Sequence, residues 1–219
     1  MTPSTARLVA LTIRGPAGDL EALLQTREPP APAVAALVCH PHPLYGGTLH
    51  NKVVHRVASV LVDSGAAVMR FNFRGVGKSA GTHDAGVGEV EDAKAALDEV
   101  RRRFPVARVW IAGFSFGSWI AARLAVREPG VGRLILVAPP VGTSSFEVLH
   151  TSTIPKLVIQ GNRDVNCPVG LLEREFPRWA DPKELRVVEG ATHFFDKQLS
   201  ALADALVQGL ASLEEGATS

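Results

Sequence analysis

The amino-acid sequence predicts an α/β fold in which a mostly parallel β-sheet is covered by helices on both faces. Strand-like and helix-like segments alternate along almost the whole chain, which is the pattern of such a sheet. Several strand-like segments are continuous apolar runs, as expected of strands buried on both sides. The chain has 219 residues, and this length favours one large domain over residues 1–219.

The first expected elements form an antiparallel hairpin. Residues 7–14 and 20–26 alternate apolar with polar side chains, and the segment between them contains Gly15, Pro16 and Gly18, which suit a turn. The next expected elements are a buried strand at 34–39, a helix over 51–62, a strand at 67–73, a glycine-rich loop at 74–81 and a helix over 88–104.

The second half of the chain continues the alternation. The expected elements are strands at 108–112, 134–138, 156–160 and 185–188, and helices at 117–127, 171–179 and 197–213. The final residues, 214–219, are expected to fray. No internal repeat or low-complexity linker interrupts the pattern, so we expect one domain built on about eight strands.

Composition and charge exclude several classes of function. The chain has 23 basic and 22 acidic residues, a balance that offers no attractive field for nucleic acid or an anionic membrane. Two cysteines, Cys39 and Cys167, are too few for a disulfide framework or a four-cysteine zinc site. The chain has no apolar run long enough for a signal peptide or a membrane span. We therefore expect a cytoplasmic, most simply monomeric, protein whose partner is a small-molecule substrate.

The strongest chemical signal is the segment Gly113-Phe114-Ser115-Phe116-Gly117. It lies between a buried strand and a helix, where Gly-x-Ser-x-Gly forms a sharp turn that exposes a nucleophilic serine. Both flanking positions need glycine because a side chain there would collide with the neighbouring backbone. Ser115 is the candidate nucleophile, and the N–H of Phe116 is expected to face the oxyanion.

A serine hydroxyl needs a general base, and the base needs a group that orients it. In this turn type the acid and the histidine follow the serine in that order along the chain. Asp164 comes after the strand at 156–160, and His193 comes after the strand at 185–188. Because the carboxyl ends of parallel strands meet at one edge of a sheet, the sequence predicts a catalytic triad of Ser115, Asp164 and His193.

With these motifs the chain resembles the α/β-hydrolase superfamily over almost its whole length. It is most similar to small bacterial serine hydrolases with a His-Pro-His-Pro segment after the third strand, here His40-Pro41-His42-Pro43. The loop Arg74-Gly75-Val76-Gly77-Lys78-Ser79 also matches a loop of many members. The resemblance implies an α/β-hydrolase fold and hydrolysis of carboxylic esters, thioesters or peptides, without a cofactor.

The loop after the third strand normally supplies a second oxyanion donor. Pro41 and Pro43 have no N–H, which leaves Leu44, the preferred candidate, or His42. Only residues 139–155 connect the sixth and seventh strands, too few for a helical lid domain. We therefore expect an open substrate pocket walled by Tyr45, Val165 and Phe194.

Other interpretations of the sequence remain as alternatives. A serine aminopeptidase or amidase would use the same triad, and a non-catalytic binding module would keep only the fold. His40 and His42 could hold a metal, although alternating side chains of an extended segment point to opposite faces. Gly77-Lys78-Ser79 invites a nucleotide-phosphate interpretation, but Asn72 stands where the phosphate loop requires glycine. Ester or thioester hydrolysis without a metal is the favoured prediction.

Overall fold

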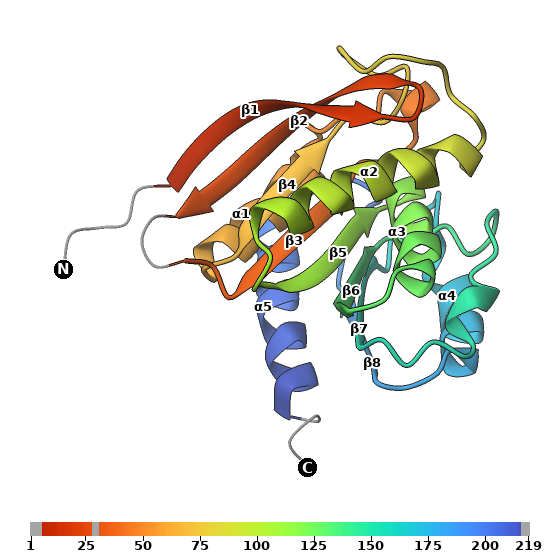
Figure 1. The fold of residues 1–219 in the computed structure, drawn as a ribbon. Coiled ribbons are helices and arrows are strands. Elements are labelled where there is room, and N and C mark those ends of the chain that lie inside the picture. The colour runs from red at the N-terminus through yellow and green to blue at the C-terminus, as the bar shows by residue number, and fades with distance from the viewer. Residues whose placement is uncertain (1–5, 28–30, 216–219) are drawn as a thin grey trace.

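A computed structural model describes residues 6–27 and 31–215. It contains an eight-stranded sheet in the order β1-β2-β4-β3-β5-β6-β7-β8 (Figure 1). The strands are β1 (Ala6–Gly15), β2 (Gly18–Arg27), β3 (Val34–Cys39), β4 (Ala67–Phe71), β5 (Arg108–Phe114), β6 (Val131–Val137), β7 (Lys156–Gly161) and β8 (Lys183–Val188). The pairings β1–β2 and β2–β4 are antiparallel, and the remaining five are parallel. The α/β-hydrolase fold with an N-terminal hairpin is confirmed.

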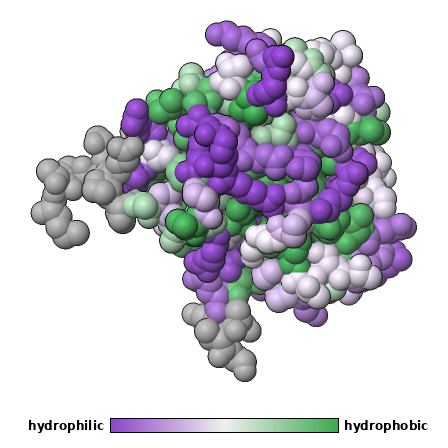
Figure 2. All heavy atoms as spheres, viewed as in Figure 1, coloured by the Kyte–Doolittle hydropathy of each residue, from purple (hydrophilic) through white to green (hydrophobic). Residues whose placement is uncertain are grey.

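Helices cover both faces of this sheet. On one face, α2 (Val87–Arg103) and α3 (Phe116–Arg127) pack on the core; α1 (Lys52–Asp63) and α5 (Leu199–Glu215) cover the opposite face. A shorter helix, α4 (Val169–Glu175), precedes β8 (Figure 1). The outer side of α2 is hydrophilic, as expected for an amphipathic helix at the surface (Figure 2).

The order of the central strands creates a natural position for a site. From β3 the chain moves to β4 on one side, and from β4 it crosses back to β5 on the other side of β3. At such a reversal the loops after the two neighbouring strands diverge and leave a crevice at their carboxyl ends. The loops that follow β3 and β5 carry His42 and Ser115.

Element boundaries differ from the sequence expectations by a few residues. Helix α5 continues through Glu215, and residues 216–219 lie outside the described part, so the expected fraying of residues 214–219 stays a prediction. The connection from β6 to β7 contains a 3₁₀ turn, Glu147–Leu149. None of the helices in the described ranges is long and apolar enough to cross a membrane.

Candidate active site

Ser115 lies in a strained turn between β5 and α3. Its backbone has φ +52° and ψ −122°, a region that residues other than glycine rarely occupy. The turn is held because the Ser115 N–H donates to Val137 O at 2.8 Å and the Ser115 carbonyl accepts from the Ser118 N–H at 2.8 Å. These hydrogen bonds therefore maintain the strained backbone, and the turn places the half-buried Ser115 side chain at the end of β5.

The two glycines of this turn are required by close backbone contacts. A Cβ on Gly113 would lie 2.1 Å from Gly117 O, and a Cβ on Gly117 would lie 2.3 Å from Cys39 O. Real Cβ atoms essentially never approach other atoms so closely. Glycine at both positions therefore lets the turn approach the end of β3.

Ser115, His193 and Asp164 form a continuous chain of polar contacts. The Ser115 Oγ lies 3.1 Å from His193 Nε2, and His193 Nδ1 lies 2.8 Å from Asp164 Oδ2. These partners assign the proton of a neutral imidazole to Nδ1, which leaves Nε2 to accept the serine proton. The structure thus brings together all three residues that the sequence selected, from the ends of β5, β7 and β8.

Asp164 is held by bonds to both of its carboxylate oxygens. Oδ1 accepts from the backbone N–H groups of Asn166 at 2.9 Å and Cys167 at 2.8 Å. Oδ2 accepts from the side-chain amide of Gln160 at 3.1 Å, in addition to its contact with His193. Both oxygens of this buried carboxylate are satisfied, so its orientation toward the imidazole is fixed.

Cys167 lies beside these residues without competing as a nucleophile. Burial, with a smaller effect of the Asp164 charge, raises the pKa of its thiol to about 12, so the thiol stays protonated near neutral pH. Donor atoms of Asp164, Cys167 and His193 lie within 4.8 Å of one another, a spacing that could hold a metal ion. The Asp164 and His193 atoms already bond each other, however, and a metal would have to break that contact.

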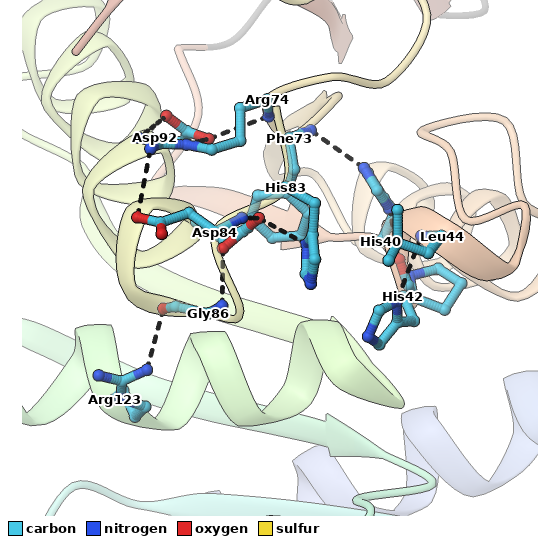
Figure 3. Close-up of polar contacts among 12 residues, drawn as sticks. His40, His42, Leu44, Phe73, Arg74, His83, Asp84, Gly86, Asp92 and Arg123 are labelled. Carbon is cyan, nitrogen blue, oxygen red and sulfur yellow. Dashed lines mark hydrogen bonds and ion pairs between the residues drawn. The ribbon is translucent and has the colours of Figure 1, made fainter. Parts of the chain in front are cut away.

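The first histidine of the His-Pro-His-Pro segment is a buried structural connector (Figure 3). His40 Nε2 accepts from the Phe73 N–H at 3.0 Å, so Nδ1 carries the proton and donates to Pro41 O at 2.6 Å. Burial lowers the pKa of His40 to about 4 and keeps the ring neutral. Because both ring nitrogens are engaged, His40 has none left for the metal that the sequence had suggested.

The bond from His40 also fixes the direction of the next peptide. In a trans peptide the N–H points opposite to the carbonyl of the same unit. The Pro41–His42 bond is trans, and its carbonyl points at the His40 ring, so the His42 N–H points away from that ring. Within residues 6–27 and 31–215, neither the His42 N–H nor the Phe116 N–H donates to a protein acceptor.

The preference for Leu44 as oxyanion donor does not fit this geometry. Its N–H donates to His42 Nδ1 at 3.2 Å (Figure 3), and its side chain is exposed and lies outside the cavity lining. Of the two candidates in the loop, His42 is the one whose N–H is unengaged. The sequence could not distinguish these two donors, because both have an N–H. The difference arises because the His42 ring folds back over its own loop and accepts the Leu44 N–H.

A cavity of about 370 Å³ opens directly onto Ser115 and His193. Its lining residues are His42, Tyr45, Ser115, Phe116, Pro140, Thr143, Ser144, Asn166, Cys167, His193 and Phe194. Tyr45 and Phe194 wall it as expected. Val165 is not among the residues that line it, and 86 % of this residue is exposed.

Several residues of the cavity and its support could not be found from the sequence. Pro140, Thr143 and Ser144 come from the β6–β7 connection, whose sequence carries no recognisable motif. Gln160 carried no motif, and its role depends on the exact end of β7. His83, from the segment between β4 and α2, lies with its ring 4.9 Å from the His42 ring and tilted by 46° to it, and only tertiary packing places it there.

Comparisons with known proteins agree with this fold. The family model described as serine aminopeptidase, S33 matches residues 33–149. An uncharacterized protein of Rickettsia prowazekii is 38% identical over 210 residues, which cover 91% of this chain and 87% of the relative.

Two solved structures are similar over most of their length. An α/β serine hydrolase homologue from Coxiella burnetii has 42% identity and a TM-score of 0.88, covering 92% of this chain and 97% of that one. An α/β serine hydrolase without a lid from Xanthomonas campestris has 37% identity and a TM-score of 0.88, covering 94% of each chain. This chain therefore belongs to the α/β-hydrolase superfamily and, within it, to the family whose model is described as serine aminopeptidase, S33.

Proposed function

We propose that this chain hydrolyses a small, uncharged carboxylic ester or thioester through an acyl-enzyme intermediate. The observation that carries the proposal is the Ser115–His193–Asp164 chain of contacts, which ends in a cavity large enough for a small acyl group. Nucleophile, base and orienting acid are thus within reach of one another and of a substrate carbonyl.

The reaction follows from these positions. Ser115 Oγ attacks the carbonyl carbon while His193 Nε2 takes the hydroxyl proton, and His193 then gives this proton to the leaving alcohol or thiol. Water attacks the resulting acyl-serine ester in the same way, with His193 again as base, and releases the carboxylic acid and free Ser115. Asp164 holds the imidazole in the required tautomer and stabilises its cation.

The N–H groups of Phe116 and His42 are the proposed oxyanion donors. Both residues line the cavity with Ser115, and neither N–H is used within the described protein. Phe116 also begins α3, whose N-terminal dipole favours a developing negative charge. Donors fixed in advance by the turn and by His40 stabilise the tetrahedral intermediate without having to reorganise.

The cavity favours an ester over a peptide with a free amino terminus. The ammonium group of an aminopeptidase substrate needs a carboxylate partner, and Asp164, whose oxygens are already bonded, is not among the lining residues. Residues with hydroxyl groups or aromatic rings make up most of the lining instead. The family description keeps aminoacyl amides as the alternative substrate class.

Labelling and turnover together test this function. Wild-type protein should react with a fluorophosphonate probe and hydrolyse short-chain p-nitrophenyl esters or acyl thioesters faster than aminoacyl p-nitroanilides. Ser115→Ala should lose labelling and nearly all turnover, on the order of 10⁶ in kcat, while keeping its fold. Ser59→Ala is a matched control, because Ser59 also contacts a histidine, His55, at 3.4 Å but on the remote helix α1.

Each result has a defined meaning. Normal turnover in folded Ser115→Ala would refute the nucleophile. An unlabelled, inactive wild-type protein would support a non-catalytic binding module. Preference for aminoacyl anilides would move the function to peptide or amide hydrolysis with the same triad.

A further inference from the structure

Three aromatic rings form a cluster on one side of the proposed oxyanion hole. The His42 ring lies 4.9 Å from the His83 ring and 4.8 Å from the Phe116 ring, measured between centroids, and His83 and Phe116 are 5.9 Å apart. His42 and Phe116 are the two residues whose N–H groups we assigned to the oxyanion. His83 comes from a different segment, the loop before α2, and contacts both of them.

His83 packs on its far side against a buried carboxylate. Its Nδ1 lies 2.7 Å from Oε1 of Glu89, in the first turn of α2, in a close contact that lacks hydrogen-bond geometry, and the Glu89 side chain is fully buried. Glu89 also accepts the backbone N–H groups of Asp84 at 2.9 Å and Gly86 at 2.7 Å. One carboxylate therefore lies against the ring of His83 and holds the backbone that follows it by two hydrogen bonds.

The anchored segment is also fixed to the helix that follows the nucleophile. Arg123 of α3 donates to Gly86 O at 2.9 Å (Figure 3). Gly86 has φ +88°, and a Cβ there would lie 2.2 Å from the Trp119 ring, so only glycine permits this approach. Arg74 pairs with Asp92 at 2.9 and 2.8 Å and secures α2 itself. These contacts hold the segment that follows His83 against α2 and α3.

The orientation of the His42 ring also restrains the backbone of its own loop. The His42 Nδ1 accepts the Leu44 N–H at 3.2 Å, which ties the ring to its own loop. A rotation of the ring would break this bond and release the peptide units beside it. The contact with His83 opposes that rotation, because the ring cannot turn without losing its packing against His83.

We propose that His83, seated on Glu89, is a positioning residue for the oxyanion hole that holds the His42 and Phe116 N–H groups in register. It acts through ring packing and does not touch the reacting atoms. The inference rests on the proposed function and adds a component to it that no motif indicated.

Paired inhibitors can test this role separately from substrate binding. An alkyl trifluoromethyl ketone accepts Ser115 Oγ at its carbonyl carbon, the carbonyl π pair becomes the oxyanion, and His193 receives the serine proton. The matching methyl ketone occupies the same cavity as an unreacted carbonyl. The affinity of the first inhibitor relative to the second therefore measures the oxyanion hole.

His83→Ala should lower kcat on the order of 10-fold with KM nearly unchanged, since complete loss of one oxyanion donor costs about 10²–10³. The inhibition constant of the trifluoromethyl ketone should rise by a similar factor, and that of the methyl ketone should not change. His83→Phe, which keeps the ring, should recover most of the activity. His150→Ala is the matched control, because His150 also contacts a glutamate, Glu175, at 2.8 Å but away from the cavity.

Three results would overturn the inference: wild-type kinetics in His83→Ala, an equal weakening of both ketones, or a His83→Phe protein as impaired as His83→Ala. If His83→Ala does not fold, His83→Leu, which fills the volume without a planar ring, should show the same selective loss. Fluorine NMR of the bound trifluoromethyl ketone distinguishes failure of the proposed function from failure of the His83 role alone. Absence of the hemiketal in wild-type protein would overturn the proposed function, whereas a hemiketal that is equally stable in all variants would overturn only the role of His83.

Discussion

Acid should destabilise this protein through the buried ring of His40. Burial lowers the pKa of His40 from 6.5 to about 4 in the folded state, whereas the unfolded chain restores the ordinary value. Between pH 4 and pH 6.5, His40 is therefore protonated in the unfolded state but neutral in the folded state. Stability is therefore fully present above pH 6.5 and falls as the pH drops toward 4.

The size of this effect follows from the two pKa values. One unit of pKa difference corresponds to about 1.4 kcal/mol, so the free energy of unfolding should fall by about 2.5 kcal/mol between pH 7.5 and pH 4.5 from His40 alone. That is a large fraction of the 5–15 kcal/mol typical of a folded domain. Activity should decline over the same interval, since a protonated His40 can no longer accept the Phe73 N–H.

Urea denaturation of wild type and His40→Gln at both pH values measures this contribution. Glutamine can donate to Pro41 O and accept from the Phe73 N–H, but it does not titrate. The pH dependence of the variant should be smaller by about 2.5 kcal/mol, while all other titrating groups cancel in the comparison. Identical pH dependence in the two proteins, or an NMR titration of His40 near pH 6.5, would refute the reasoning.

Three further predictions concern catalysis. Asp164→Asn should keep the fold but allow the wrong imidazole tautomer, with kcat lower by about 10⁴; an unchanged rate at equal thermal stability would place the acid elsewhere. Activity should withstand EDTA because no proposed step uses a metal, and inactivation that zinc reverses would contradict this. Esters from C4 to C16 should be cleaved more slowly as the chain lengthens, without a rate increase at the solubility limit, since the 370 Å³ cavity cannot bury long chains and each unburied CH₂ forgoes about 0.8 kcal/mol. A steady rise toward C16 would reveal an acyl tunnel beyond the described cavity.

The fold was accessible from the sequence because its signals are local. Each buried strand is a short apolar run, and each long helix shows its own periodicity. The turn at Ser115 could also be recognised locally, since its two glycines are dictated by contacts within the turn and with the adjacent end of β3. Asp164 and His193 followed because strand ends in a parallel sheet converge.

The sequence by itself therefore determined the layered sheet, the candidate nucleophile and the order of its proposed partners. Tertiary structure alone favours His42 over Leu44 as the proposed oxyanion donor, since the His42 ring accepts the Leu44 N–H and leaves the His42 N–H unengaged. It also excluded Val165 from the cavity and brought His83 and Glu89 behind the oxyanion loop. These features depend on side-chain direction and on contacts between segments far apart in the chain, and neither leaves a periodic or local trace in the sequence.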